Sequence, residues 1–115
     1  MKTLGMSAVL AISTITTHAQ KISASQAKSH EGESESVCGI VASEHFAASS
    51  RGEPTFINLD SPYPRRLFTI LIWEEDLKRV GKIPPMGSHV CVTGGITDYH
   101  GKPQIVVRSA GQLSQ

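Results

Sequence analysis

The chain has 115 residues, of which 39% are hydrophobic and 18% are charged. This length is enough for one domain and too short for two. Eleven Lys and Arg residues stand against ten Asp and Glu residues, a formal net charge of +1, which lacks the basic excess of dedicated duplex-binding proteins. Any nucleic-acid binding must therefore come from local clusters of charge, and we expect it to be weak or directed to single strands.

The first 19 residues have the layout of a secretory signal peptide. Lys2 gives a basic start, residues 4–15 are mildly apolar, and the small residues Thr17 and Ala19 precede an expected cut after Ala19. No apolar run is long enough to span a bilayer. We therefore predict an exported protein, periplasmic or secreted, without a membrane span. The alternative is a cytosolic protein with an N-terminal tail.

Residues 20–36 are rich in Ser, Lys, Glu, Gln and Ala and hold few bulky apolar side chains. Such a segment cannot bury enough surface to offset the entropy lost on ordering. We predict a flexible linker over 20–36 and a folded domain over 37–113, a size at which a hydrophobic core alone is marginal.

Five strands and one short helix are predicted in this domain. The first three strands cover 36–46, 54–60 and 67–73, the fourth alternates Val90, Val92 and Ile96, and the fifth covers 104–107. Residues 74–81 form a short helix with acids in its first turn and bases in its last. This order is typical of the OB-fold, an all-β, five-stranded Greek-key barrel with a helix between strands three and four.

Two glycines and two cysteines lie within these strands. Gly39 is expected at a bulge or a bend point, and Gly94 at a bend or a close backbone approach. Cys38 and Cys91 each lie on the parity opposite the main apolar set of their strand. If the two strands are neighbours, an oxidising compartment favours a disulfide; the alternative is two buried thiols. Two cysteines without paired His spacing indicate neither a metal site nor a cofactor.

Several segments resemble small exported bacterial OB-fold domains, which occur alone or beside nuclease modules and are often described as nucleic-acid-binding. The resemblance covers nearly all of 37–107 and rests on these segments: 37–39, 52–60, 62–64, 68–73, 90–94 and 99–105. It implies the fold and a binding face across the second and third strands, and it specifies the ligand poorly.

On that face, aromatic rings can stack on bases while Arg and Lys contact phosphates. Phe56 points outward if Ile57 and Leu59 lie in the core. The candidate contacts for single-stranded DNA or RNA are Arg51, Phe56, Tyr63, Arg65, Arg66, Tyr99 and Lys102. The alternative is structural: Phe56 covers the barrel edge, Tyr99 plugs the barrel end, and the loop charges are merely solvated.

Catalysis has little support in the sequence. It holds no Gly-rich phosphate loop and no Gly-x-Ser-x-Gly elbow, and its acids are scattered singly or serve the helix start. We predict a non-catalytic module that binds single-stranded nucleic acid weakly and with little sequence preference. Two alternatives stay open: a periplasmic binder of a small ligand, saccharide or cation that uses Asn58, Asp60 and Thr69, and an accessory module of a larger enzyme. The oligomeric state is not indicated.

Overall fold

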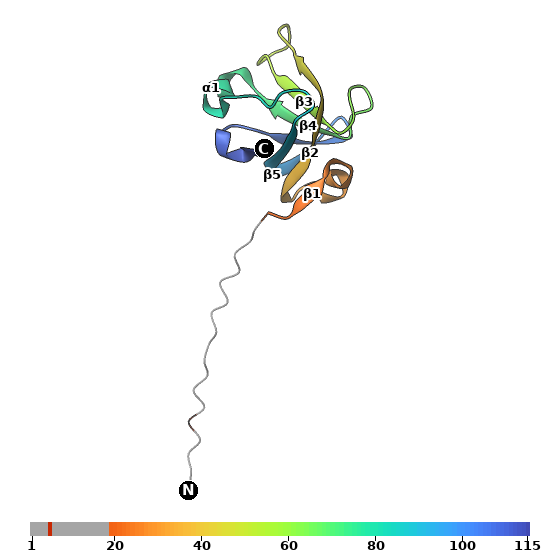
Figure 1. Ribbon diagram of the computed structural model, residues 1–115, viewed down its shortest axis with the longest axis vertical. Helices are drawn as coiled ribbons and strands as arrows, with labels where there is room; N and C mark the ends of the chain where they lie inside the picture. Colours follow the sequence, from red (N-terminus) through yellow and green to blue (C-terminus); the bar gives the residue numbers. More distant parts are fainter. Residues whose placement is uncertain (1–4, 6–18) are drawn as a thin grey trace.

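The computed structural model describes residue 5 and residues 19–115, and it is mostly β (Figure 1). Its strands are β1 (Lys21–Ser23), β2 (Ser34–Phe46), β3 (Thr55–Leu59), β4 (Phe68–Ile72), β5 (His89–Tyr99), β6 (Lys102–Val106) and β7 (Leu113–Ser114). All five predicted strands are confirmed, as β2 to β6, and β1 and β7 are additional. The predicted signal peptide lies outside the described residues except for Gly5 and Ala19.

The helical segments are short. They are the 3-10 helices η1 (Ala24–His30), η2 (Glu74–Asp76) and η3 (Ala110–Gln112), and the α-helix α1 (Leu77–Val80). The predicted helix over 74–81 is therefore present as η2 followed directly by α1. Within the described part of the chain, no helix has the length and apolar character needed to cross a bilayer.

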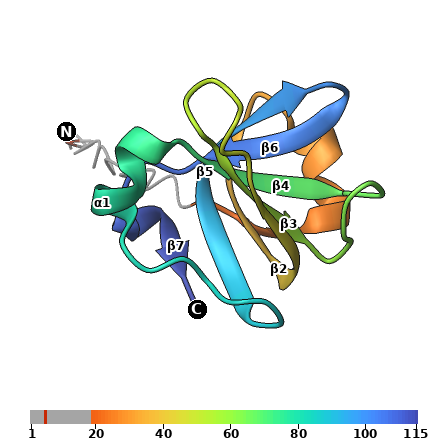
Figure 2. The ribbon, with the colours of Figure 1, turned by 90° about the horizontal axis from the view of Figure 1, so that it is seen from above.

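The strands form one seven-stranded sheet in the order β1-β2-β3-β4-β6-β5-β7, and β2 also pairs with β5. The first half of β2 pairs with β5 and its second half pairs with β3, both antiparallel, with a shift of register between Val41 and Ser43. β3 pairs antiparallel with β4, β4 parallel with β6, and β6 antiparallel with β5. The order β2-β3-β4-β6-β5, together with the pairing of β5 with the first half of β2, curls the sheet into a partial ring. Figure 2 shows β3, β4 and β6 of this ring side by side.

The core lies inside this ring. Because side chains alternate across a strand, Ile57 and Leu59 of β3 point inward and are fully buried, as the sequence predicts. They share one core cluster with Ile70 of β4, Val92 of β5 and Ile105 of β6. Full burial of such a side chain contributes about 1.5–3 kcal/mol, so this cluster is the main source of stability.

The prediction of a flexible linker over 20–36 was wrong. β1 pairs in parallel with β2, and η1 follows it directly (Figure 1). Ile22, Ala24 and Ala27 are 6%, 1% and 0% exposed and belong to the core. The average composition of the segment does not reveal this arrangement, because only three small or aliphatic side chains enter the core. The backbone of β1 forms its hydrogen bonds with β2. The folded unit therefore begins before residue 37.

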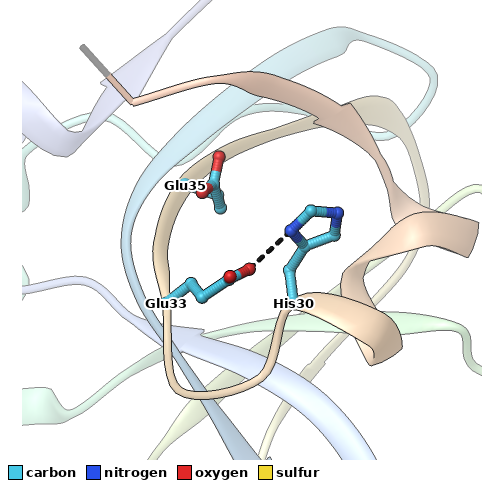
Figure 3. A group of neighbouring side chains, drawn as sticks. All are labelled: His30, Glu33 and Glu35. Atoms are coloured by element: carbon cyan, nitrogen blue, oxygen red, sulfur yellow. Dashed lines mark hydrogen bonds and ion pairs between the residues drawn. The ribbon is translucent and has the colours of Figure 1, made fainter. Parts of the chain in front are cut away.

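The turn from η1 into β2 is held in place by β5. The backbone N–H of Gly32 donates to the carbonyl oxygen of Ile96 (2.8 Å), and the N–H of Ile96 donates to the carbonyl oxygen of Glu33 (2.9 Å). His30 Nδ1 lies 2.6 Å from Glu33 Oε2, so a side-chain hydrogen bond spans the same turn (Figure 3).

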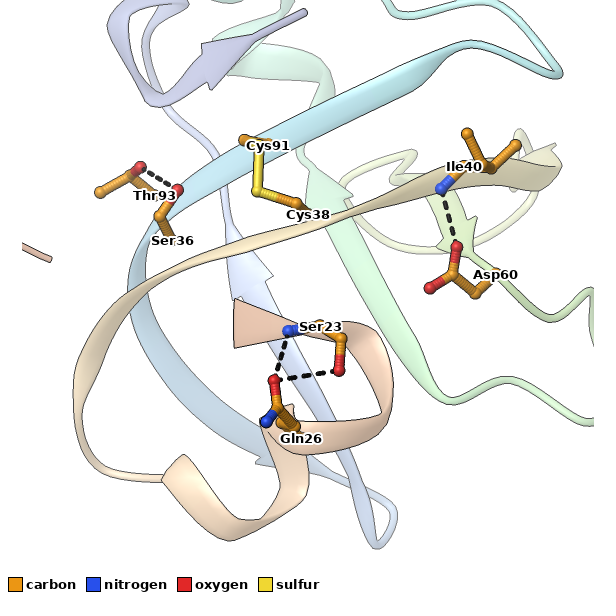
Figure 4. Close-up of a disulfide and its surroundings, with 8 residues drawn as sticks. All are labelled: Ser23, Gln26, Ser36, Cys38, Ile40, Asp60, Cys91 and Thr93. Carbon is orange, nitrogen blue, oxygen red and sulfur yellow. Dashed lines mark hydrogen bonds between the residues drawn. A yellow bond between two sulfur atoms is a disulfide. The ribbon is translucent and has the colours of Figure 1, made fainter. Parts of the chain in front are cut away.

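The disulfide is confirmed. Cys38 of β2 and Cys91 of β5 stand directly opposite each other in the antiparallel ladder and are bonded (Figure 4). Two positions along, the hydroxyl of Thr93 donates to that of Ser36 (3.1 Å). A disulfide at this position is compatible with an oxidising compartment.

The two strand glycines have different roles. A Cβ on Gly94 would lie 2.8 Å from Ile105 Cγ2, so this glycine makes room for a core side chain and not, as predicted, for another backbone. Gly39 is not at a bulge, because it pairs in register with Val90 and the shift falls later in β2. Its missing side chain leaves room for the carboxylate of Asp60, which accepts a hydrogen bond from the N–H of Ile40 (2.8 Å, Figure 4).

Candidate ligand-binding face

A row of polar side chains crosses the outer surface of the sheet. The polar row consists of Ser43 (β2), Asn58 (β3), Thr69 (β4), Gln104 (β6) and Thr97 (β5). Each of these residues is paired in the sheet with the next one in the row. In β3, β4 and β6 the residue of the row is adjacent in sequence to a core residue, so its side chain lies on the opposite face of the sheet. The row runs over the second and third predicted strands, where the sequence places the binding face.

Hydrogen bonds join Ser43, Asn58 and Thr69 within the polar row, whereas the Oε1 atom of Gln104 has no partner among the described residues. Asn58 Nδ2 donates to Ser43 Oγ (2.9 Å), and Thr69 Oγ1 donates to Asn58 Oδ1 (2.7 Å). Gln104 is only 8% exposed, and its Oε1 finds no hydrogen-bond partner among the described residues. Buried polar atoms are nearly always paired, so this oxygen is an exception, and it is shielded from solvent in the floor of the face.

Aromatic groups stand beside the polar row. Phe56 of β3 is opposite His45 of β2, and their rings are stacked with centroids 6.4 Å apart. They border a hollow of about 520 Å³, within the range of small-ligand sites. The residues that line this hollow are Ser43, Glu44, His45, Phe56, Asn58, Tyr63, Arg66 and Tyr99.

Positive charge lies at two places around the hollow: Arg66 lines it from the loop after β3, and Lys102, the first residue of β6, lies beside it. The guanidinium of Arg66 lies 5.9 Å from the centroid of the Tyr99 ring, a cation–π distance. Lys102 pairs with Tyr99 across the β5–β6 hairpin. Lys102 and Gln104 border a tight crevice that joins the hollow through its shared lining residues Phe56, Arg66 and Tyr99. Stacking surfaces and cations therefore share one face.

Lys28 of η1 fastens the β5–β6 hairpin that carries Tyr99 and Lys102. Its Nζ donates to Asp98 Oδ2 (3.0 Å) and to the carbonyl oxygen of Gly101 (2.9 Å). The hydrogen bond from Lys28, followed by the one from the N–H of Gly101, holds the pKa of Asp98 below its ordinary value. The contacts with Asp98 and Glu31 raise the pKa of Lys28. The segment predicted as a linker thus helps to position the candidate site.

The structure brings together five of the seven candidate residues. Phe56, Tyr63, Arg66 and Tyr99 line the hollow, and Lys102 borders the adjoining crevice. Tyr99 is 43% exposed, so it does not plug the end of the ring.

The other two candidates lie elsewhere. Arg51 lines a separate hollow of about 460 Å³ with Gly52, Trp73, Glu74 and Glu75. Arg65 is exposed on the loop after β3 and lines neither cavity of the candidate face. Loop residues that are close in sequence need not share a face, because a turn sends successive side chains in different directions.

Sequence reasoning missed four residues of the polar row and of the aromatic pair beside it: Ser43, His45, Thr97 and Gln104. Only the register of β2, β5 and β6 against their neighbours shows that they stand in line with Asn58 and Phe56. Asp60, named in the alternative with Asn58 and Thr69, is not in the row, because its carboxylate is bound by the N–H of Ile40.

Comparison with known proteins adds information on the fold alone. No family model matches this chain, and no curated protein matches it. Among solved structures, it is similar to a chain described as a putative aspartyl-tRNA synthetase from Leishmania major Friedlin, with a TM-score of 0.55 and 14% identity. The match covers 88% of this chain and 21% of that one, so this chain spans about a fifth of the solved protein. At this identity the likeness concerns the backbone arrangement and no individual residue.

Proposed function

We propose that this chain is an exported, non-catalytic OB-fold domain that binds single-stranded nucleic acid weakly and with little sequence preference. The fold assignment is supported by the pairing of β2 with both β3 and β5 and by the parallel pairing of β4 with β6. It is also supported by the helical segment between β4 and β5. Five strands in this arrangement support the proposal of a Greek-key barrel of the OB type. Export is supported by the disulfide and by the layout of residues 1–19.

The observation that carries the proposal is the convergence of Phe56, Tyr63, Tyr99 and Arg66 on one hollow. Each base stacked on such a ring contributes about 1–3 kcal/mol, whatever its identity. An Arg guanidinium both binds phosphate and stacks on flat rings. Among the residues that the structure describes, Arg66 and Lys102 bring positive charge to this face, so few phosphates are neutralised and the affinity is expected to be modest.

Titration of labelled single-stranded oligonucleotides at several salt concentrations, followed by fluorescence anisotropy, tests this proposal. Two phosphate contacts predict a slope of log K against log salt of about −1.4 for a single strand. Arg66→Ala should weaken binding to every sequence alike and reduce the slope by about 0.7. Phe56→Ala should lower the affinity roughly 5- to 150-fold, equivalent to about 1–3 kcal/mol for one stacked base.

Arg51→Ala is the matched control, because Arg51 lies in a different hollow. It should leave both the affinity and the slope unchanged within experimental error. If the folded protein binds neither single-stranded DNA nor RNA at low salt, the proposal is wrong. An equal loss in the Arg51 and Arg66 variants would refute the assignment of the face.

A second candidate function is binding of a small hydroxylated ligand such as a saccharide. The hollow of about 520 Å³ favours it, because Ser43 and Asn58 line that hollow beside the ring of Phe56, as does the nearly neutral charge of the chain. Sugar hydroxyls exchange hydrogen bonds with hydroxyl and amide side chains of this kind. Salt-independent binding of a glycan that shifts the NMR signals of the Asn58 amide would favour this function over nucleic-acid binding.

A further inference from the structure

We propose that His30, Glu33 and Glu35 form a site for one divalent transition-metal ion, of which zinc is the best match. The three residues lie where η1 ends and β2 begins, and none of them lines the hollow of the candidate face. This inference is independent of the proposed function, because it concerns different side chains and a different ligand.

The three side chains converge although they come from different elements. His30 is the last residue of η1, Glu33 is in the turn, and Glu35 is the second residue of β2 (Figure 3). One donor atom from each lies within 4.8 Å of the others. Zinc bonds of about 2.1 Å in tetrahedral geometry place donor atoms about 3.4 Å apart. To reach that geometry the side chains must turn, and the hydrogen bond between His30 Nδ1 and Glu33 Oε2 (2.6 Å) must open or the ring must bind through Nε2.

The backbone that carries these donors is already fixed. Gly32 and Glu33 exchange hydrogen bonds with Ile96 of β5 (2.8 and 2.9 Å), and Glu35 pairs with Gly94 in the same ladder. A metal ion binding here would therefore order side chains and not a loop, which lowers the entropic cost of binding.

An unpaired buried oxygen points to a cation at this place. Glu35 Oε2 is buried and has no hydrogen-bond partner among the described residues. Removing a carboxylate oxygen from water without a partner is costly, and a bound cation removes that cost. Lys28, the neighbouring ammonium group, does not fulfil this role, because it is engaged by Glu31 (3.1 Å) and Asp98 (3.0 Å).

The donor set selects the metal. Calcium and magnesium prefer oxygen ligands throughout, whereas an imidazole with two carboxylates suits zinc and similar ions. Three protein ligands leave the fourth position to water. Bound there, the ion would join the end of η1 to β2 and strengthen the attachment of the N-terminal segment to the ring.

Isothermal titration of the full, tag-free chain with zinc chloride tests this site. We expect one zinc ion per chain, a rise in the melting temperature on zinc addition, and at least 100-fold weaker binding of magnesium. His30→Ala and Glu35→Gln should each lower the zinc affinity at least tenfold. Glu31→Gln and His89→Ala are the controls, since both residues lie outside the trio, and they should change the affinity less than threefold.

NMR of the imidazole nitrogens in the unaltered chain gives a measurement that does not depend on the folding of any variant. Zinc should shift the ring signals of His30 and leave those of His89 in place. The proposal is overturned if the unaltered chain does not bind zinc, if a folded His30→Ala variant binds it equally well, or if the signals of His30 do not respond.

Discussion

Lys28 shows how one side chain connects the N-terminal segment to the candidate face. Its ammonium group contacts Asp98 and Gly101, the two residues at the ends of the turn segment that includes Tyr99. Both partners gain from the contact: the pKa of Asp98 is lowered and that of Lys28 is raised. The interaction is exposed to solvent, where such pairs contribute little to global stability, so its main effect is on the position of the hairpin.

The pKa of Asp98 tests this contact at the scale of the residue. A carboxyl with a lowered pKa contributes stability above its ordinary value of 3.8 and loses it as the pH falls through the folded-state value. Lys28 contributes below its ordinary value of 10.5 and loses it as the pH rises through its folded-state value. Lys28→Met should raise the pKa of Asp98, measured by NMR titration of its carboxyl carbon. Lys21→Met should not, and an unchanged Asp98 pKa in the Lys28 variant would contradict the contact.

At the scale of the element, β5 and β2 are the two strands that each pair with three others. β5 pairs with β2, β6 and β7. Its two consecutive glycines face different surroundings: a Cβ on Gly94 would meet Ile105 at 2.8 Å, whereas a Cβ on Gly95 would meet nothing within 4 Å. The alternation of sides along a strand explains this difference between neighbours.

Gly94→Ala should therefore destabilise the protein and Gly95→Ala should not. The added methyl group at position 94 meets a fully buried, β-branched side chain that cannot move aside, and overpacking of this kind costs about 1–3 kcal/mol. Gly95→Ala should change the free energy of unfolding by less than about 0.5 kcal/mol, as is usual at exposed positions. Urea denaturation measures both. Equal effects of the two substitutions would show that Gly94 is not a point of close approach.

At the scale of the whole molecule, the ring and one covalent bond restrain a small core. The disulfide joins β2 to β5 across a sequence separation of 53 residues. A cross-link over such a span removes much of the freedom of the unfolded chain. For a domain of this size, where net stability is small, that restraint is a large share of the total.

Replacement of both cysteines by serine should lower the free energy of unfolding by about 2–4 kcal/mol. Chemical denaturation of the oxidised protein and of the double variant provides the comparison. Reducing agent should destabilise the former and leave the latter unchanged. A double variant as stable as the oxidised protein would show that the bond does not restrain the unfolded chain.

The strands and the core could be predicted because their signal is local. The alternation in 54–60 and 67–73 places Ile57 and Ile70 inside with no knowledge of their partners. The cysteine pair was predictable from parity once two strands were assumed to be neighbours. The N-terminal segment was not predictable in this way, since Ile22, Ala24 and Ala27 become core residues only through packing against β2 and the ring.

The sequence by itself determined five of the seven strands, which of their sides is apolar, and that aromatic and basic residues gather in the loops and at the strand ends. Only the tertiary structure decided which of those residues meet, because strand register joins positions far apart in the chain. It placed Arg66, and neither Arg51 nor Arg65, beside Phe56 and Tyr99. It also aligned Gln104 with Thr69 and brought His30 toward Glu35. Periodicity is a property of one strand, whereas a site is a property of the contacts between strands.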